Sequence, residues 1–344
     1  MVPVGNEPLL KLDNLHKHFG QRSGLTDLIF GRDKEIVKAV DGVSFDLQEE
    51  DAVGVIGESG CGKSTLLHTL IGFHEPTKGE IYYEGEPISE FSKADWKEYR
   101  RNVQIIFQDP FNTLDPKLTV KETLKEPLIV HNMENKEERI HDVLERVELS
   151  PSEQYAEQFP DQLSGGEKQR VAIARALVLE PKVLLADEPV SMLDVSTQAS
   201  ILDLLSDLVD SLGVSLLYIS HDLSTVSYVC DAVNVMYLGT NVETGPTTEI
   251  IEDPLHPYTQ GLISAIPIPD PDYDRPRTEI QGSAQDPVDI GGGCRFADRC
   301  PEKMDICEKA PELVDAGSNR KVSCHLHYDH DEIDNNKDAH PTES

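Results

Sequence analysis

The sequence is poor in basic residues: its 344 residues include 31 lysines and arginines against 63 aspartates and glutamates, which gives a formal charge of -32. Surfaces that bind nucleic acid need an excess of basic residues to neutralise phosphates, so we expect no nucleic-acid partner. Long apolar runs are also lacking, because none approaches the roughly 20 residues that a membrane-spanning helix requires. Any role at a membrane must therefore come through partner proteins.

A secretion signal is missing as well. The chain starts Met-Val-Pro-Val-Gly-Asn-Glu, with neither the basic beginning nor the apolar stretch of such a signal. We therefore expect a cytosolic and soluble protein, in which the six cysteines stay reduced and form no disulfide framework. The chain is long enough to bury a sizeable core and to carry more than one domain.

What the sequence does contain is a complete phosphate-binding loop of the form G-x-x-x-x-G-K-[ST]. The apolar segment Ala52–Ile56 before the loop predicts a buried strand, and Thr65–Ile71 after it predicts a helix that stops near Gly72. Strand, loop and helix thus follow one another as the motif requires, which disfavours an ordinary glycine-rich turn. The residues predicted to bind the nucleotide are Gly57, Glu58, Ser59, Gly60, Cys61, Gly62, Lys63, Ser64 and Thr65.

The residue types in this loop suit the binding of phosphates. Glycines let the backbone wrap an anion so that consecutive N–H groups point inward, and the N-terminus of the following helix adds partial positive charge. We expect Lys63 to reach the β- and γ-phosphates and the hydroxyl of Ser64 to hold Mg²⁺. Cys61 is expected to be a reactive thiol without a catalytic role.

Two carboxylates end a second apolar segment. Val183–Ala186 is apolar throughout, as expected for a parallel strand covered on both faces, and Asp187 and Glu188 follow it. Ligands bind at the carboxyl ends of such strands. We expect Asp187 to orient Mg²⁺ through water and Glu188 to polarise the attacking water. The alternative, a pair of solvated acids, is disfavoured by the phosphate loop upstream.

The order of these motifs resembles that of the ATP-binding cassette (ABC) ATPases, over roughly residues 9–253 and beyond. Leu163–Glu167 is similar to the signature motif of this family, and Ser191–Asp194 to the loop that crosses to a partner subunit. The resemblance implies that Gln108 touches Mg²⁺ and the attacking water. It also implies that His221 contacts the γ-phosphate, although a lone histidine after a strand is more often structural.

The resemblance further implies that Phe19 stacks on adenine, whereas without it Phe19 reads equally well as a core residue. Two positions depart from the usual pattern of the family. Glu167 stands where glutamine is common, and Met192 stands where a small residue is common. Neither change removes a phosphate ligand, so we expect weak effects at most.

In this family the signature motif binds the ATP that is held by the other subunit. The resemblance therefore implies a head-to-tail pair of subunits with two ATP molecules at the interface. Ser164, Gly165 and Gly166 would cap the γ-phosphate across that interface, and Asp194 would lie in the crossing loop. ATP binding then favours the closed pair and hydrolysis releases it.

We expect an α/β fold with a P-loop ATPase core, an antiparallel β subdomain and a helical subdomain at about residues 110–175. The ATP-binding domain is assigned to residues 1–253, with a polar insertion at Thr26–Glu35. Residues 254–328 form a loop-rich extension that is similar to the C-terminal region of oligopeptide/dipeptide permease ATPases. Residues 329–344 are polar and predict a disordered tail.

The extension contains four of the six cysteines, in the spacing C-x5-C-x6-C-x16-C. Four thiolates suit tetrahedral Zn²⁺ or an iron–sulfur cluster. The spacing is looser than that of zinc C-x2-C pairs, and relatives in this permease family carry the same pattern, in some members around a [4Fe–4S] cluster. Zn²⁺ and unligated thiols stay open as alternatives. The four residues are Cys294, Cys300, Cys307 and Cys324.

Histidines in the same region raise the question of a second metal site. We interpret His256 as a loop residue, because it lies in a Pro-rich stretch. The remaining histidines near the C-terminus are interpreted as solvated side chains. They are His325, His327, His330 and His340.

Together these features predict the ATP-hydrolysing subunit of an ABC importer for di- or oligopeptides, at the cytoplasmic face of the cell membrane. The implied partners are two transmembrane permease subunits docked near Gln108–Leu118, an extracellular substrate-binding protein, and a second ATPase subunit of the same or a related chain. Two alternatives stay open: the same motor with sugar or nickel as cargo, and a soluble ABC ATPase that acts in repair or translation.

The acidic excess leads to a prediction about salt. It is spread along the chain and exceeds what solubility needs, as on proteins from salt-accumulating halophiles, where salt screens the self-repulsion. We expect the melting temperature to fall, and structure to be lost, as ionic strength is lowered. Circular dichroism melts across a KCl series measure this, and a melting temperature independent of salt would contradict it.

Overall fold

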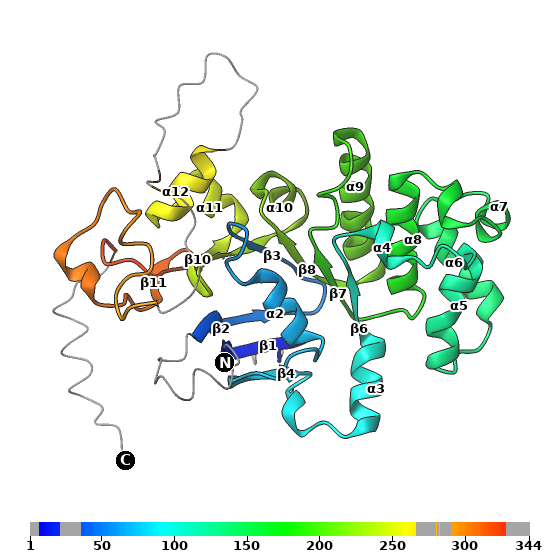
Figure 1. The fold of residues 1–344 in the computed structure, drawn as a ribbon, viewed down its shortest axis with the longest axis horizontal. Coiled ribbons are helices and arrows are strands. Elements are labelled where there is room, and N and C mark those ends of the chain that lie inside the picture. The colour runs from blue at the N-terminus through cyan, green and yellow to red at the C-terminus, as the bar shows by residue number, and fades with distance from the viewer. Residues whose placement is uncertain (1–6, 21–35, 266–279, 281, 283–289, 328–344) are drawn as a thin grey trace, which may run out of the picture.

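The computed structural model describes residues 7–20, 36–265, 280, 282 and 290–327. The expected polar insertion, the Pro-rich stretch after Ala265, the tail, His330 and His340 lie outside the described residues. The described part is an α/β structure with two sheets and their covering helices (Figure 1).

The larger sheet has eight strands and holds the segments that the motifs follow. Five strands at one end run parallel to one another, and the three at the other end pair antiparallel. The spatial order is β6 (Val103–Ile106), β7 (Val183–Asp187), β8 (Ser215–Ser220), β3 (Ala52–Ile56), β9 (Ala232–Tyr237), β10 (Thr240–Pro246), β12 (Arg320–Val322) and β11 (Val314–Gly317).

The central strands are buried on both faces, and alternate residues enter two different cores. In β7, Leu184 packs into the cluster under the helical region, whereas Leu185 packs into the cluster under the second sheet. Leu216 and Leu217 of β8 divide in the same way. This two-sided burial explains why these strands read as unbroken apolar runs in the sequence.

The second sheet is antiparallel, as expected from the sequence, and has four strands. In spatial order they are β2 (Ile36–Leu47), β1 (Leu10–Gly20), β4 (Lys78–Tyr83) and β5 (Glu86–Pro87). A helix, α2 (Lys63–Leu70), shares a core with this sheet and with one face of the larger sheet. Leu66 and Leu67 of α2 pack there with Leu12 and Val43. The helix after the phosphate loop is thereby held between the two sheets.

Helices predominate between residues 110 and 175, as the sequence predicts. Ser92, Thr119 and Ser164 each begin a helix with a capping box, in which the side chain and the residue three places on exchange hydrogen bonds. The helices of this region are α4 (Pro110–Thr113), α5 (Val120–Val130), α6 (Lys136–Arg146), α7 (Ser152–Ala156) and α8 (Gly165–Leu177), with the short 3₁₀ turn η2 (Pro160–Gln162). The 3₁₀ turn η1 (Ile88–Glu90) and the helix α3 (Lys93–Asn102) precede it in the chain.

Three further helices, α9 (Val195–Leu212), α10 (Leu223–Val229) and α11 (Thr247–Glu252), pack into the same core cluster as the helices α5 to α8. In α9, Ile201, Leu204, Leu205 and Leu208 are spaced along one helix face and are buried in the core, whereas Leu212 at the helix end is exposed. None of the described helices is both long enough and apolar enough to cross a membrane.

The C-terminal extension contains more regular structure than the sequence indicates. It begins with α12 (Pro257–Ser264) and includes the 3₁₀ turn η3 (Asp305–Glu308). Its two strands, β11 and β12, continue the larger sheet through pairing of β12 with β10. In Figure 1 the extension therefore lies at the end of this sheet that is opposite the helical region.

The interpretation of His325 and His327 as solvated side chains is wrong, whereas His256 does lie in a loop but is buried. His256 is buried and caps α12, because its Nδ1 accepts from the N–H of Tyr258 at 3.0 Å. His325 is also buried and contacts the carbonyl of Lys309 at 3.0 Å. His327 is half-buried, with Nε2 2.8 Å from the carbonyl oxygen of Leu255. These side chains satisfy backbone groups inside the extension, which sequence spacing does not reveal.

Burial of His256 leads to a prediction about acid stability. Burial, with a smaller contribution from His327, lowers its pKa from 6.5 to about 3, so the folded protein keeps it neutral where the unfolded chain protonates it. Stability is therefore lost as the pH falls below 6.5, by about 2 kcal/mol at pH 5. His256→Asn keeps a capping oxygen but does not titrate. Denaturant melts at pH 7.5 and pH 5 should show a smaller acid loss in this variant, and an equal loss would contradict the assignment.

Candidate functional site

The phosphate loop joins the end of β3 to the start of α2 in a backbone conformation that glycine permits. Gly62, the residue before α2, has φ of +109°, and a Cβ placed there would lie 1.9 Å from the carbonyl oxygen of Ala39. Gly57 has φ of +157°, and a Cβ there would lie 2.2 Å from the carbonyl oxygen of Met236. The loop is therefore wrapped tightly between β2 and β9, with no space for side chains at these two positions.

The side chain of Lys63 lies inside the curve of this loop. It is 5% exposed, and its Nζ donates to the carbonyl oxygens of Gly57 at 2.7 Å and of Glu58 at 3.1 Å. The ammonium group is thus held by two backbone carbonyls at the start of the loop. Cys61 is buried beside it, and burial raises the pKa of its thiol. The expectation of a reactive thiol is therefore wrong, because a buried thiol with a raised pKa is mostly protonated and inaccessible.

Three parallel strands bring the acidic residues to the loop. β8 lies between β3 and β7, and their carboxyl ends align, since Ile56 is level with Ser220 and Asp187 with Ile219. The hydroxyl of Ser64 lies 3.4 Å from the Oδ1 of Asp187. Burial raises the pKa of Asp187, and a nearby cation would offset this cost.

Glu188 is the centre of a second set of contacts at the same edge. The Nε2 of Gln108 donates to its Oε2 at 3.0 Å, and Nδ1 of His221 lies 3.1 Å from its Oε1. Its backbone is in the left-handed region, with φ of +45°, and its N–H donates to the carbonyl of Ile219 at 2.9 Å. The structure thus brings together three residues from β7, β8 and the loop after β6 that were identified separately in the sequence.

The signature residues lie at the start of α8. Ser164 caps this helix and exchanges hydrogen bonds with Glu167, whose carboxylate accepts from the N–H of Ser164 at 2.8 Å. Glutamate therefore serves the capping box as well as glutamine would. A Cβ on Gly166 would lie 2.5 Å from Thr197 in α9, so glycine lets the two helices approach. In Figure 1, α8 lies apart from α2, and the described chain does not bring its own signature motif to its phosphate loop.

Two further predicted residues have structural contacts. Asp194 caps α9, with its Oδ1 accepting from the N–H of Thr197 at 3.1 Å, and hydrogen bonds from the hydroxyls of Ser196 and Thr197 lower its pKa. Phe19 is half-buried at the end of β1, where its ring centroid lies 5.2 Å from that of His74 and 5.0 Å from the Nζ of Lys17. A position in the apolar core is therefore excluded for Phe19, and adenine stacking stays a prediction.

Sequence reasoning missed the residues that approach the loop from the extension. Arg299 forms an ion pair with Glu58 of the phosphate loop, and the hydroxyl of Tyr258 accepts from the N–H of Glu58 at 2.8 Å. Arg295 forms an ion pair with Asp41 in β2. Two features of the sequence could have indicated this contact. Glu58 is an acidic residue in a loop that is predicted to bind anions, and Arg295 and Arg299 lie close together between Cys294 and Cys300 in a strongly acidic chain.

Asp41 belongs to a group that could suggest another metal site. His16 and His18 lie 2.8 and 2.7 Å from its Oδ1, and these three are the only described residues with three ligand atoms within 4.8 Å of one another. Burial alone would raise the pKa of Asp41, but hydrogen bonds from the histidines and Arg295 lower it further than burial raises it. Positive charge is therefore already supplied, and we assign this group to the support of β2.

The four cysteines of the extension are neighbours. Burial, with smaller contributions from repulsion by the other three thiols, raises the pKa of Cys324 to about 11. Burial likewise raises the pKa values of Cys294 and Cys300, with Cys307 contributing to both. No three of these sulfurs lie within 4.8 Å of one another. The thiols thus gather in one place at a spacing wider than a single small ion requires.

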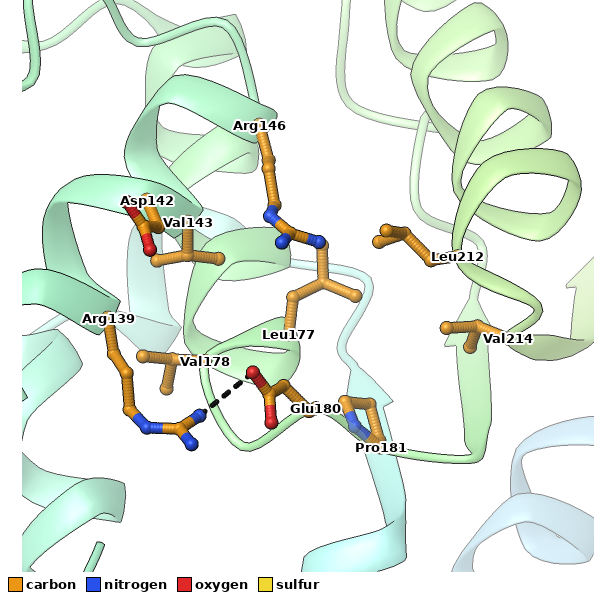
Figure 2. A pocket seen from close by; sticks show the side chains of 10 residues that line it. All are labelled: Arg139, Asp142, Val143, Arg146, Leu177, Val178, Glu180, Pro181, Leu212 and Val214. Carbon is orange, nitrogen blue, oxygen red and sulfur yellow. Dashed lines mark ion pairs between the residues drawn. The ribbon is translucent and has the colours of Figure 1, made fainter. Parts of the chain in front are cut away.

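A separate pocket lies between α6, the end of α8 and the end of α9 (Figure 2). Arg139 projects across it to form an ion pair with Glu180 at 3.0 Å, and Arg146 and Leu212 line it. None of the predicted nucleotide or metal residues lines this pocket. We assign it to the joint between the helical region and the sheet.

Comparison with known proteins relates the chain to transport ATPases. A family described as ABC transporter matches residues 40–191, and one described as oligopeptide/dipeptide transporter, C-terminal region, matches residues 242–307. The oligopeptide transport ATP-binding protein AppF of Bacillus subtilis (strain 168) is 42% identical over 334 residues, which cover 95% of this chain and 100% of that protein. The oligopeptide transport ATP-binding protein OppF of Escherichia coli (strain K12) is 40% identical, with 94% and 97% covered.

A solved structure of similar fold comes from a dimeric ATP-binding cassette, MJ0796, in a post-hydrolysis state with ADP and phosphate bound. It is 30% identical in sequence, has a TM-score of 0.59, and is aligned over 69% of this chain and 98% of its own.

The contacts of Glu188 lead to a prediction. Glu188→Gln keeps the size of the side chain and removes its charge and basicity, so we expect ATP hydrolysis to fall by about 100-fold or more while ATP binding is retained. ATP should then hold the variant as a dimer on size-exclusion chromatography. Glu98→Gln, a change at an exposed position of α3, is the control. Hydrolysis at the wild-type rate by Glu188→Gln would show that another group acts as the base.

Proposed function

The chain belongs to the ABC transporter family of ATPases, within the group of oligopeptide and dipeptide transport ATP-binding proteins, and we propose that it hydrolyses ATP to drive the import of di- and oligopeptides. The observation that carries the proposal is the convergence of Ser64, Asp187, Glu188, Gln108 and His221 at one edge of the parallel sheet. A family member of this kind hydrolyses ATP, and the proposal concerns which residues do so and for what cargo.

ATP would bind with its phosphates in the loop between β3 and α2. Lys63, already directed into the curve of the loop, would pair with the β- and γ-phosphates, and the loop N–H groups would donate to phosphate oxygens. Glu188 would accept a proton from the attacking water. Its contacts with Gln108 and His221 support this role, because they fix the carboxylate before the substrate arrives.

The residues present fit a magnesium ion. A hydroxyl, a carboxylate and an amide supply oxygen ligands, which Mg²⁺ prefers, and burial raises the pKa of Asp187, a cost that a bound cation would offset. We propose that Ser64, Gln108 and Asp187 would hold the ion. When bound, Mg²⁺ neutralises phosphate charge and orients the triphosphate.

The active unit we propose is a head-to-tail dimer. The separation of α8 from the phosphate loop within one chain supports it, since Ser164, Gly165 and Gly166 would then act on the ATP of the partner. The N-terminus of α8 suits a phosphate, because its N–H groups and partial positive charge point outward there. The similar cassette MJ0796 is a dimer, which agrees with this arrangement.

The permease subunits would dock on a groove beside the helical region. Residues from β6, from the loop after it and from α8 line this groove, and Gln108 follows β6 directly. The lining residues include Ile105, Phe107, Leu114, Pro127 and Ala176. A groove that joins the Gln108 loop to the helical region is suited to transmit movement of the helices to a bound membrane protein. This docking would place the chain at the cytoplasmic face of the membrane.

Peptides are the cargo that the comparisons favour, since the curated relatives named above are oligopeptide transport proteins. A substrate-binding protein outside the cell would deliver the peptide, and the second ATPase subunit would be the same or a related chain. Import of sugar or nickel by the same motor is the alternative. A soluble role in repair or translation is disfavoured, because the chain carries the oligopeptide/dipeptide C-terminal region.

We also propose that the protein works at high ionic strength. The charge of -32 supports this, because a chain so acidic repels itself unless salt screens the charges.

The four cysteines fit an iron–sulfur cluster better than a zinc ion. Zn–S bonds of about 2.3 Å place tetrahedral sulfurs about 3.8 Å apart, whereas no three of these sulfurs lie within 4.8 Å. A [4Fe–4S] cluster holds its cysteine sulfurs farther apart, at the corners of a larger body. Cys294, Cys300, Cys307 and Cys324 would bind it, and its contribution would be to fix the fold of the extension.

The cluster assignment predicts what anaerobic purification will yield. We expect about four iron atoms per chain and a broad absorption band near 400 nm that disappears on exposure to air. Cys300→Ser should lower the iron content, whereas Cys230→Ser, at a buried position of the ATPase core, should not. One zinc per chain would favour the Zn²⁺ alternative, and protein free of both metals would favour unligated thiols.

The function is tested by what the chain brings with it from native membranes. Purification of the tagged protein in high salt and without oxygen, followed by mass spectrometry, should recover two permease subunits and a binding protein that carries peptides. Recovery of permeases together with a binding protein that carries a sugar or a metal would support an importer ATPase with a cargo other than peptide. Recovery without any membrane partner would contradict the importer.

A further inference from the structure

Glu58 is an acidic residue inside a loop that binds polyphosphate. Its carboxylate is held in a bidentate ion pair by Arg299, with Nη1 2.7 Å from Oε2 and Nη2 2.9 Å from Oε1. The side chain of Arg299 is 6% exposed and that of Glu58 is 26% exposed. Bidentate, charge-assisted pairs of this kind fix both distance and orientation. The two residues are 241 positions apart in the chain, so the contact ties the extension to the phosphate loop.

Arg299 is itself held rigidly. Its guanidinium carbon lies 5.7 Å from the ring centroid of Tyr237 and 6.0 Å from that of Phe296, distances at which a cation is attracted to a ring face. The backbone N–H of Arg299 donates to the carbonyl of Phe296 at 2.9 Å. The hydrogen bonds to Glu58 raise the pKa of Arg299, so the group stays charged at every pH of interest. The arginine therefore acts as a fixed positive charge.

A third contact shows that the extension holds the backbone of the loop as well as the side chain. The hydroxyl of Tyr258 in α12 accepts from the N–H of Glu58 at 2.8 Å. The rings of Tyr258, Tyr237 and Phe296 pack together with centroids 4.7 to 5.5 Å apart. One aromatic cluster thus supports both the arginine and the tyrosine that contact Glu58.

We propose that Arg299 is a positioning residue for ATP binding, which neutralises Glu58 and fixes the start of the phosphate loop from the C-terminal extension. An unpaired carboxylate at this place would repel the triphosphate and would be free to turn toward the loop's N–H groups. Pairing with Arg299 prevents both. The proposal rests on ATP binding by the loop and is independent of the cargo, so a change of cargo would leave it intact.

Binding of nucleotides to the full-length chain tests this role. Arg299→Met should weaken the binding of ATPγS, a slowly hydrolysed ATP analogue, by about tenfold. The loss should be smaller for ADP and smaller still for AMP, because repulsion by Glu58 acts on phosphate charge. Arg299→Lys keeps the charge and should recover much of the affinity. In steady-state hydrolysis, KM should rise more than kcat falls.

A double-mutant cycle separates charge neutralisation from general damage to the extension. If Arg299 acts through Glu58, the double variant Glu58→Gln/Arg299→Met should bind ATPγS more tightly than Arg299→Met alone. Arg320→Met is the matched control, because Arg320 is an arginine of the extension that pairs with Asp253 instead of the phosphate loop. Circular dichroism melts of each variant establish that it is folded.

Two results would overturn the proposal. The first is unchanged ATPγS affinity in folded Arg299→Met or, if that variant does not fold, a loss of about tenfold in Arg299→Lys relative to Arg320→Met, because lysine keeps the charge. The second is an additive cycle in which Glu58→Gln gives no recovery, with equal losses for ATPγS, ADP and AMP. That pattern would assign Arg299 to the stability of the extension alone. Failure of peptide transport with the expected nucleotide affinities would instead bear on the proposed function.

Discussion

The alignment of three neighbouring parallel strands fixes the position of nearly every group in this site. Because β8 pairs with both β3 and β7, the phosphate loop, Asp187 and His221 leave the sheet at the same edge. Alternate residues of these strands enter two separate cores, so a shift of one strand would bury the wrong residues on both faces. Packing on both faces therefore fixes the register of these strands, and the register in turn fixes where the residues of the site lie.

The extension depends on the same sheet. β12 pairs with β10, and β10 pairs with β9, whose other neighbour is β3 with the phosphate loop at its end. The segment between Cys294 and Cys300 carries both arginines that reach back to the ATPase core. Two of the four neighbouring cysteines, Cys294 and Cys300, therefore flank in sequence the arginine that contacts Glu58. The extension and the nucleotide site are parts of one structure, although the sequence separates them by some 240 residues.

Local features of the fold could be predicted from sequence, and long-range features could not. The strand before the phosphate loop, the helix after it, the strand before Asp187 and the helical region at about 110–175 follow from apolar patterning and short motifs, which act within a few residues. The partner of Arg299 and the burial of His256 depend on which distant segments meet, and patterning carries no such information. The thiol of Cys61 was misjudged for the same reason, since its motif indicates position but says nothing of exposure.

The central claim is that hydrolysis at this site energises peptide uptake, and its most direct test measures both at once. The chain, its permeases and its binding protein would be reconstituted in vesicles, and ATP hydrolysis and the accumulation of a labelled peptide would be recorded in parallel. The account predicts that peptide stimulates hydrolysis and that uptake requires ATP, in a fixed ratio to the ATP consumed. The account would be contradicted if peptide did not stimulate hydrolysis, no peptide accumulated while ATP was hydrolysed, and a different solute accumulated instead.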